Sequence, residues 1–287
     1  NMLNELLKQV PTAPEGLPVT DIIAESAQFP GIAVQDGTCY VHYQAFQNHH
    51  DTLKVGVLNG AGLEDVTVIS GEGEVLCPVS LAHGGAVWYA WSEAKDRHWS
   101  VKARFVKNGV WSDTILVDEG EAVLYPCLYT YAGGLNLIWT RQHRNRAEAV
   151  TCPLNEGGGG AAVVSQCSEA YRANACEGGD GNLYVTYDAY RNGGYDVMAR
   201  VKTAEGWSGE VRVDQSDDWV CAPRIMPALS GATVCWYTFG YGATFGVYCA
   251  DLSAQDGALC AALPQTLTKN VGWYMDLAAA SNSKGLQ

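Results

Sequence analysis

Residues 171–213 read YRANACEGGDGNLYVTYDAYRNGGYDVMARVKTAEGWSGEVRV and contain one complete unit of the repeat that decides the fold. Segments rich in Val, Thr and Tyr at 171–176, 183–188, 195–202 and 207–213 are separated by Gly, Asn and Asp, which is typical of strands joined by tight turns. The unit has no ten-residue stretch of helical periodicity, so it does not fit a βαβ arrangement. We therefore expect four antiparallel strands in each unit.

Two sequence markers repeat along the chain with one period. A short hydrophobic segment ends in an aromatic residue five times, at spacings of 48, 48, 48 and 49, at Tyr43, Trp91, Trp139, Tyr187 and Trp236. A second marker, an X–Pro pair in most units, precedes each of them, at Phe29-Pro30, Cys77-Pro78, Tyr125-Pro126, Tyr171-Arg172 and Ala222-Pro223. Two markers that keep one period through five units indicate a repeat architecture.

Four short strands at this period are typical of the blades of a β-propeller. We predict an all-β, six-bladed propeller over residues 17–287, with five complete repeats and a partial sixth that begins near Trp273. The segment 17–24 resembles a fourth strand and is expected to complete the sixth blade. Residues 1–16 form an N-terminal extension with a helix candidate at 2–10. The sequence stops within the sixth unit, so either the ring is truncated, or the sixth blade is degenerate, or the ring has five blades with an extra tail. A truncated ring would expose a sheet edge, and there we expect a further domain or a partner chain.

The composition limits the class of protein and its partners. Hydrophobic residues make up 47% of the chain and charged residues 17%, which indicates a folded globular protein. The formal net charge of -13 disfavours nucleic acid and anionic membranes as partners, and no apolar run is long enough to span a membrane. The ten Cys residues form no CxxC pair, and Cys235 lies in an apolar run. We expect buried, reduced thiols and a cytoplasmic protein, or alternatively a secreted protein whose signal peptide has been removed.

Strand alternation divides the connections between two faces of the propeller. The turns after strands one and three are largely Gly, Asn and Asp. The loops after strands two and four hold His, Arg, carboxylate and aromatic side chains, and four of the six His lie in the loops after strand two, at His49, His50, His98 and His143. Because loops on a rigid scaffold commonly carry function, we expect the ligand site on this second face, the loop face.

The loop face suits a polar, ring-shaped ligand such as a glycan. An aromatic ring covers the apolar side of a sugar, and charged groups bind its hydroxyl or acid groups. For any one residue the alternative is a solvated loop tip, and Trp219 can instead be a packing anchor of the repeat. The predicted ligand-binding residues are Trp99, Arg144, Tyr190, Arg191, Trp219 and Tyr241.

Catalysis on a glycan would require two carboxyl groups about 5–9.5 Å apart. Asp188 and Glu93 follow strand two directly and are the best candidates, although nothing in the sequence selects a pair. The loop histidines of three successive blades could bind zinc, but we predict no metal and no cofactor. The run Gly157–Gly160 lacks the Lys and the helix that follow a phosphate loop.

The units resemble the repeats of sialidase-like, BNR-type six-bladed propellers, at 171–172, 179–185, 187–197 and 206–208. The resemblance covers residues 17–287 and implies a propeller with a carbohydrate-active or carbohydrate-binding role. The chain departs from the family pattern because it has no Ser-x-Asp-x-Gly-x-Thr-Trp box. The segment Pro-Arg-Ile-Met-Pro at 223–227 is the nearest match to the sialidase arginine motif but carries an inserted Met, and no arginine triad can be assembled.

Three functions fit these patterns. The one we favour is a glycoside hydrolase-like enzyme of the sialidase superfamily that acts on a glycan at the loop face. The others are a non-catalytic carbohydrate-binding module and a protein-interaction propeller of a larger protein. The expected partner is a glycan or another polar small ligand. A deep pocket with two carboxyl groups at hydrolase spacing would favour the enzyme, whereas a shallow face with exposed rings would favour binding.

Overall fold

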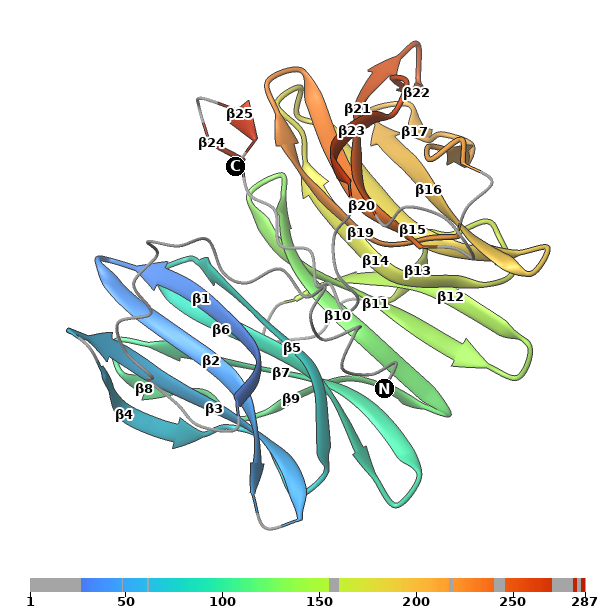
Figure 1. The fold of residues 1–287 in the computed structure, drawn as a ribbon. Coiled ribbons are helices and arrows are strands. Elements are labelled where there is room, and N and C mark those ends of the chain that lie inside the picture. The colour runs from blue at the N-terminus through green and yellow to red at the C-terminus, as the bar shows by residue number, and fades with distance from the viewer. Residues whose placement is uncertain are drawn as a thin grey trace, which may run out of the picture.

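The computed structural model describes residues 27–47, 49–60, 62–154, 160–216, 219–239, 246–269, 281–282 and 285–286. Within these ranges the chain is built of strands and turns without an α-helix, so the predicted all-β class is confirmed. None of the described segments is a long apolar helix of the kind that crosses a membrane. The strands form antiparallel sheets that follow one another in chain order, and this arrangement fits a β-propeller (Figure 1).

Five sheets, here called blades 1 to 5, make up most of the described structure. Blade 1 contains β1 (Ala27–Gln35), β2 (Thr38–Gln47), β3 (His50–Asn59) and β4 (Gly62–Val68). Blade 2 contains β5 (Glu74–His83), β6 (Ala86–Lys95), β7 (His98–Lys107), β8 (Val110–Trp111) and β9 (Ile115–Gly120). Blade 3 contains β10 (Ala122–Tyr131), β11 (Gly134–His143), β12 (Arg146–Pro153) and β13 (Ala162–Val163).

Blade 4 contains β14 (Ala170–Glu177), β15 (Leu183–Arg191), β16 (Gly194–Thr203), β17 (Gly206–Trp207) and β18 (Val211–Arg212). Blade 5 contains β19 (Trp219–Ala228), β20 (Gly231–Phe239), β21 (Gly246–Gln255), β22 (Ala258–Ala261) and β23 (Gln265–Lys269). A separate two-stranded sheet pairs β24 (Ser281–Asn282) with β25 (Gly285–Leu286).

The first strands of successive blades contact one another in the order β1, β5, β10, β14 and β19. Each of them contains a β-bulge, where its register with the second strand shifts. A non-glycine residue has a positive φ at every bulge: Phe29 (47°), Cys77 (51°), Tyr125 (55°), Arg172 (50°) and Ala222 (52°). The second sequence marker is therefore this bulge, and in blade 4 it lies at Arg172-Ala173, one residue later than expected. Bulges re-aim side chains, and they are frequent next to active sites.

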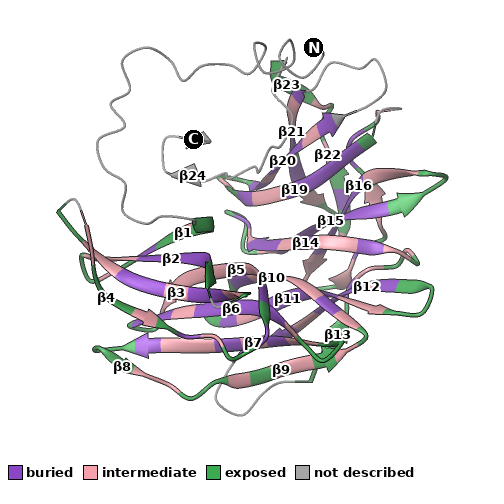
Figure 2. Cartoon of the chain, turned by 60° about the horizontal axis from the view of Figure 1, so that its bottom comes forward, coloured by how far each residue is buried: buried purple, intermediate pink, exposed green. Residues whose placement is uncertain are grey.

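The core lies between successive blades, and burial concentrates in the middle strands of each sheet (Figure 2). The aromatic residues of the first marker are 1% exposed or less in blades 2 to 5 and pack toward the preceding blade, at Trp91, Trp139, Tyr187 and Trp236. Side chains alternate along a strand, so the residue after each of these faces the opposite way. In blades 2 to 4 that residue is polar and fully buried: Ser92, Thr140 and Asp188.

The fourth strand of blade 4 is broken into two short pieces, where one continuous strand was predicted at 207–213. β17 and β18 both pair with β16. The Arg200 Nε–H donates to the carbonyl oxygen of Ser208 between them (2.9 Å), and its guanidinium lies 5.2 Å from the ring centre of Trp207. This contact holds the interrupted strand against β16, and Arg104 does the same in blade 2.

Several sequence predictions concern the ends of the chain. The pairing of segment 17–24 with the sixth blade and the helix at 2–10 lie outside the described residues, so blade count and ring closure stay predictions. Cys235 lies in β20 and is buried, as predicted. All ten Cys lie in the described ranges, and none of them forms a disulfide there.

Candidate functional site

An ion pair between Arg172 and Asp188 lies where blades 3, 4 and 5 meet on the loop side of their first strands. Arg172 is the bulge residue of β14, and its Nε–H donates to Asp188 Oδ2 in β15. The backbone N–H of Arg172 donates to Thr140 Oγ1 in blade 3 (3.2 Å). The backbone of Arg172 is thus held by blade 3, and its side chain is held by β15 of its own blade.

Asp188 is completely buried, and its two oxygen atoms differ in their partners. Besides the bond from Arg172, Oδ2 accepts the backbone N–H of Ala222, the bulge residue of β19 (3.4 Å). Oδ1 has no hydrogen-bond partner in the described part of the chain. Burial raises the pKa of Asp188 to about 6, against the opposing effects of Arg172, the Ala222 amide and Arg224. A carboxyl group with this pKa can change its protonation near neutral pH.

Tyrosine rings surround the arginine of this ion pair. The Arg172 guanidinium lies 5.8 Å from the ring centre of Tyr125 in blade 3 and 5.2 Å from that of Tyr195 in blade 4. Tyr195 makes edge contacts with two further rings, Tyr190 at 5.1 Å and Tyr171 at 6.2 Å. Cation–π and edge-to-face contacts of this kind hold the side chains in a fixed arrangement. We call these five residues the aromatic–arginine cluster.

Two exposed rings, Tyr190 and Trp219, border the solvent at this cluster. Their exposed fractions are 38% and 47%. A Cβ atom added at Gly194 would lie 3.3 Å from Trp219 Cδ1, so the indole ring lies over the β15–β16 hairpin. On the same hairpin Arg191 donates two hydrogen bonds to Asp196 Oδ2, at 3.0 and 2.7 Å. Three predicted ligand-binding residues, Tyr190, Arg191 and Trp219, therefore lie on or against one hairpin.

Glu169 places a second carboxylate beside the cluster. Its Oε1 accepts the hydroxyl of Tyr171 (3.3 Å), and its carbonyl oxygen accepts the backbone N–H of Tyr190 (3.0 Å). Burial, followed by the charge of Glu169, raises the pKa of Tyr171 to about 12. The carboxylate is thus bound to the Tyr171 ring of the cluster, and the backbone of Glu169 is bound to that of Tyr190.

Glu93, the other predicted catalytic carboxylate, lies in the interface between blades 1 and 2. It accepts hydrogen bonds from Trp91 Nε1 (2.9 Å), Lys102 Nζ (2.7 Å) and the Gly71 backbone (3.1 Å). Burial by itself would raise the pKa of Glu93, but these hydrogen bonds outweigh it and hold the pKa below its usual value. A carboxylate bound in this way ties the two blades together, and it belongs to a different interface from Asp188.

The remaining predicted residues do not join the cluster in the described structure. Trp99 is partly buried and packs against the core between blades 2 and 3. Arg144 is exposed at the tip of the β11–β12 hairpin, where its backbone N–H donates to Glu121 Oε2 (2.9 Å). Tyr241 lies outside the described residues. Across the described ranges, His, Cys, Asp and Glu side chains do not gather in groups of three that could hold a metal ion.

Sequence reasoning missed Arg172 and the rings that enclose it as site residues. Arg172 is charged, whereas the bulge residues of the other four described blades are Phe, Cys, Tyr and Ala. This departure within a repeat was a usable signal. Tyr195 pairs directly with Tyr190 across the hairpin, so it could also have been found from the register of the predicted turn.

Comparison with known proteins finds similarity in structure but not in sequence. No protein-family model matches the chain, and no curated protein does. The structure of a thermostable family-43 glycoside hydrolase is similar over 88% of this chain and 98% of its own, at 12% identity and a TM-score of 0.51. A subtype N10 neuraminidase-like protein of a strain from the little yellow-shouldered bat is similar over 91% of this chain and 85% of its own, at 12% identity and a TM-score of 0.55.

A third similar structure is described by its title as a puromycin-hydrolyzing peptidase of Mycobacterium tuberculosis. It matches 87% of this chain but only 38% of its own, at 14% identity and a TM-score of 0.56. Identities this low show the fold alone, since one fold carries many activities. The likenesses support a β-propeller of a kind that occurs in glycoside hydrolases, and they do not single out the BNR-type sialidase repeats.

Proposed function

We propose that this protein is a carbohydrate-active β-propeller that binds a glycan at the aromatic–arginine cluster. The observation that carries the proposal is the exposure of two rings, Tyr190 and Trp219, beside the ion pair of the partly exposed Arg172 with the buried Asp188. Exposed rings cover the apolar face of a sugar, and nearby carboxylate and guanidinium groups bind its hydroxyl groups. Rings and charges held by contacts within the chain form a preorganised surface, which lowers the entropic cost of binding.

Recognition without turnover is the form of this function that the geometry favours. Hydrolysis needs two carboxyl groups on either side of one glycosidic bond. Asp188 has no exposed surface and is bound to Arg172, while Glu93 lies in another blade interface. The exposed groups are rings, which bind sugars without reacting with them.

Glycoside hydrolysis, in the manner of the sialidase superfamily, is the second candidate function. It is favoured by the raised pKa of Asp188 and by its unpartnered Oδ1, since a general acid must be protonated near the working pH. Glu169 would be the second carboxyl group. Turnover in this form would require the ligand to displace Arg172 from Asp188.

The proposal extends to the whole chain and its surroundings. The proposed ring has six blades, and segment 17–24 completes the sixth. A cytoplasmic location is supported by ten cysteines that form no disulfide among the described residues. Thiol counting under denaturing, non-reducing conditions tests it, and three or more disulfides would exclude it. The acidic net charge argues against nucleic acid and membrane partners.

A glycan array probed with the full chain tests the function, followed by titration of any glycan that binds. Tyr190→Ala and Trp219→Ala should each weaken binding about tenfold or more. Phe46→Ala is the matched control, because Phe46 is 62% exposed and follows its repeat aromatic by three residues, as Tyr190 does. An absence of any glycan that binds at about millimolar concentration would overturn the proposal, as would an equal loss with Phe46→Ala.

One further variant separates recognition from hydrolysis. Asp188→Asn keeps the shape of the side chain but cannot act as a general acid. If the protein only binds, wild type releases no sugar and the variant binds the glycan at a similar strength. If the protein hydrolyses, wild type releases sugar from the bound glycan and the variant does not.

A further inference from the structure

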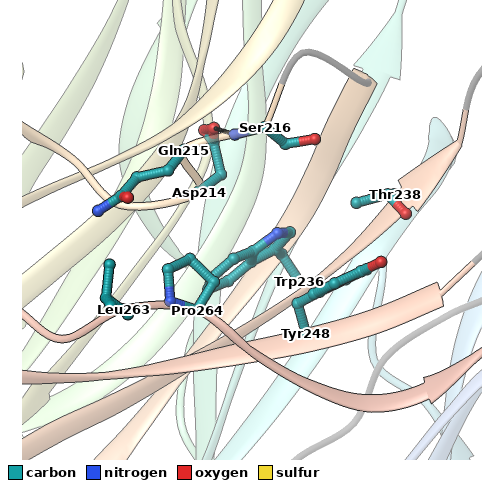
Figure 3. A pocket seen from close by; sticks show the side chains of 8 residues that line it. All are labelled: Asp214, Gln215, Ser216, Trp236, Thr238, Tyr248, Leu263 and Pro264. Carbon is teal, nitrogen blue, oxygen red and sulfur yellow. Dashed lines mark hydrogen bonds between the residues drawn. The ribbon is translucent and has the colours of Figure 1, made fainter.

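A cavity of about 410 Å³ opens between blades 4 and 5, and it shares no residue with the aromatic–arginine cluster (Figure 3). Its size falls within the range of small-molecule sites. The lining comes from the end of blade 4, from β20 and β21, and from the segment between β22 and β23. The lining residues are Asp214, Gln215, Ser216, Trp236, Thr238, Tyr248, Leu263 and Pro264.

The equivalent position in blades 2, 3 and 4 is closed by a carboxylate. The repeat aromatic donates its polar hydrogen to that carboxylate in each case: Trp91 Nε1 to Glu93 (2.9 Å), Trp139 Nε1 to Asp118 (2.7 Å) and the Tyr187 hydroxyl to Glu210. In blade 3, Arg141 Nε also donates to Asp118 (2.8 Å) and fills the remaining space. A buried donor with its acceptor in place leaves nothing for a ligand to bind.

Blade 5 lacks this closure. Asp214 follows Val213 as Asp118 follows Val117, but its carboxylate accepts Arg212 Nε (2.9 Å) and the backbone N–H of Val197 (2.7 Å) instead. The indole nitrogen of Trp236 makes no hydrogen bond with the described residues, and Figure 3 shows no interaction drawn to it. Thr238 stands where blade 3 has Arg141, and its buried hydroxyl has no partner in the described structure.

The walls of the cavity define the chemistry of its ligand. Tyr248, Leu263 and Pro264 supply an apolar side, and the stacked rings of Trp236 and Tyr248 lie 6.4 Å apart at 18°. Trp236 supplies a hydrogen-bond donor on the other side. Asp214 is already neutralised by Arg212, so the cavity offers no charge to an ionic ligand. We propose that this cavity binds an uncharged, polyhydroxylated ring of monosaccharide size, with a hydroxyl oxygen accepting the Trp236 indole N–H.

The test follows the indole signals of the ¹⁵N-labelled full chain during titration with methyl glucoside, methyl galactoside and methyl mannoside. The Trp236 signal is assigned from the Trp236→Phe variant, and the Trp139 signal from Trp139→Phe. At least one of the three probes should shift the Trp236 signal in a saturable manner at about millimolar concentration. The Trp139 signal, whose hydrogen is already bound to Asp118, should not move.

Two variants close the cavity in different ways. Thr238→Arg restores the arrangement of blade 3, in which an arginine meets the carboxylate, and it should abolish the shift. Leu263→Trp narrows the mouth from an exposed position (74% exposed) and should weaken binding about tenfold or more without entering the core. Leu229→Trp is the control, since Leu229 is 90% exposed on a different turn and its substitution should leave the titration unchanged.

The outcomes separate this cavity from the cluster. Tyr190→Ala should leave the Trp236 titration unchanged, whatever becomes of glycan binding at the aromatic–arginine cluster. A Trp236 signal that fails to move with all three probes would overturn the proposal. So would a shift that persists in both Thr238→Arg and Leu263→Trp, because the probe would then bind outside the cavity.

Discussion

The interface between blades 2 and 3 and the interface between blades 4 and 5 use the same repeat positions in different ways. In the first, Asp118 accepts hydrogen bonds from both Trp139 and Arg141. In the second, the equivalent Trp236 and Thr238 have no such partner among the described residues, and a cavity lies between them and the preceding blade. Where a buried polar group is satisfied within the chain it holds blades together, and where it is left open it is available to a ligand.

A second comparison concerns the residue that follows the repeat aromatic, which is Thr140 in blade 3 and Asp188 in blade 4. Thr140 accepts the bulge amide of Arg172 from the next blade, and Asp188 accepts the bulge amide of Ala222. In these two interfaces the position supplies a hydrogen-bond acceptor to the next blade, whereas Ser92 at the same position of blade 2 has no partner in the described structure. The charge of Asp188 and its unpartnered Oδ1 go beyond the role of an acceptor, and burying a charge is costly. We attribute the excess to the site that Asp188 and Arg172 build.

The largest effect should separate Asp188 from Thr140. Asp188→Leu leaves Arg172 without its ion-pair partner in a largely buried place and should lower the free energy of unfolding by about 3–5 kcal/mol. Thr140→Val removes one neutral hydrogen bond and should cost about 1 kcal/mol. Urea unfolding of both variants measures the difference. Equal losses of unfolding free energy would show that Asp188 contributes no more to stability than Thr140 does.

The sequence was sufficient to predict the repeat and the placement of its strands. Val, Thr and Tyr runs bounded by turn residues predicted the four segments of blade 4, and β15 and β16 agree with them to within three residues. The repeat marker also identified the bulges, although Tyr171-Arg172 was one residue out of register. A local pattern sets a strand, so a single sequence is informative here.

The site was only partly predictable, because its contacts join different blades. Tyr190, Arg191 and Trp219 were nominated from loop composition, and they do lie together. The role of Glu93 depends on Gly71, which approaches from the preceding blade, and on Lys102 across the sheet. Such partners are far apart in sequence. Only the packing of the blades decides whether a carboxylate is fully hydrogen-bonded within the chain or keeps an oxygen without a partner.

The next effect concerns pH and the charge of Asp188. Its pKa is about 6 in the folded chain and near 3.8 when unfolded, so the folded state binds the proton more tightly. The free energy of unfolding should therefore fall as pH rises from about 4 to 7, by at most about 3 kcal/mol. Asp188→Asn removes this contribution, so wild type should lose stability relative to the variant over that range. Taking the difference cancels other titrating groups, including His42, whose pKa burial lowers to about 4.

The opposite slope would reverse the assignment. If wild type gains stability relative to Asp188→Asn as pH rises, Arg172 dominates and the pKa of Asp188 lies below its unfolded value. Arg172 and Asp188 would then stay charged throughout this pH range, and the hydrolase candidate would lose its general acid.

A smaller effect should distinguish the two tryptophans. Trp139→Phe and Trp236→Phe remove the same atoms from equally buried positions. Only Trp139 loses a hydrogen bond to a carboxylate, so it should cost about 1.5–3 kcal/mol more in unfolding free energy. Thermal and urea unfolding of the pair provide the measurement. Equal losses would mean that the Trp236 indole N–H already donates to an acceptor within the chain. A ligand in the cavity would then not be needed as its acceptor.

The smallest expected effect should have opposite signs at Thr238 and Thr140, two buried threonines that follow their repeat tryptophans by two residues and by one. Thr238→Val replaces a buried hydroxyl that has no partner in the described structure with a methyl group of similar size. Burying an unpaired polar group is unfavourable, so this change should be neutral or stabilise the protein by up to about 1 kcal/mol. Thr140→Val, in contrast, breaks its bond to the Arg172 amide and destabilises the protein. Urea midpoints resolve the two directions, and a loss of stability with Thr238→Val would show that its hydroxyl is bonded within the folded chain.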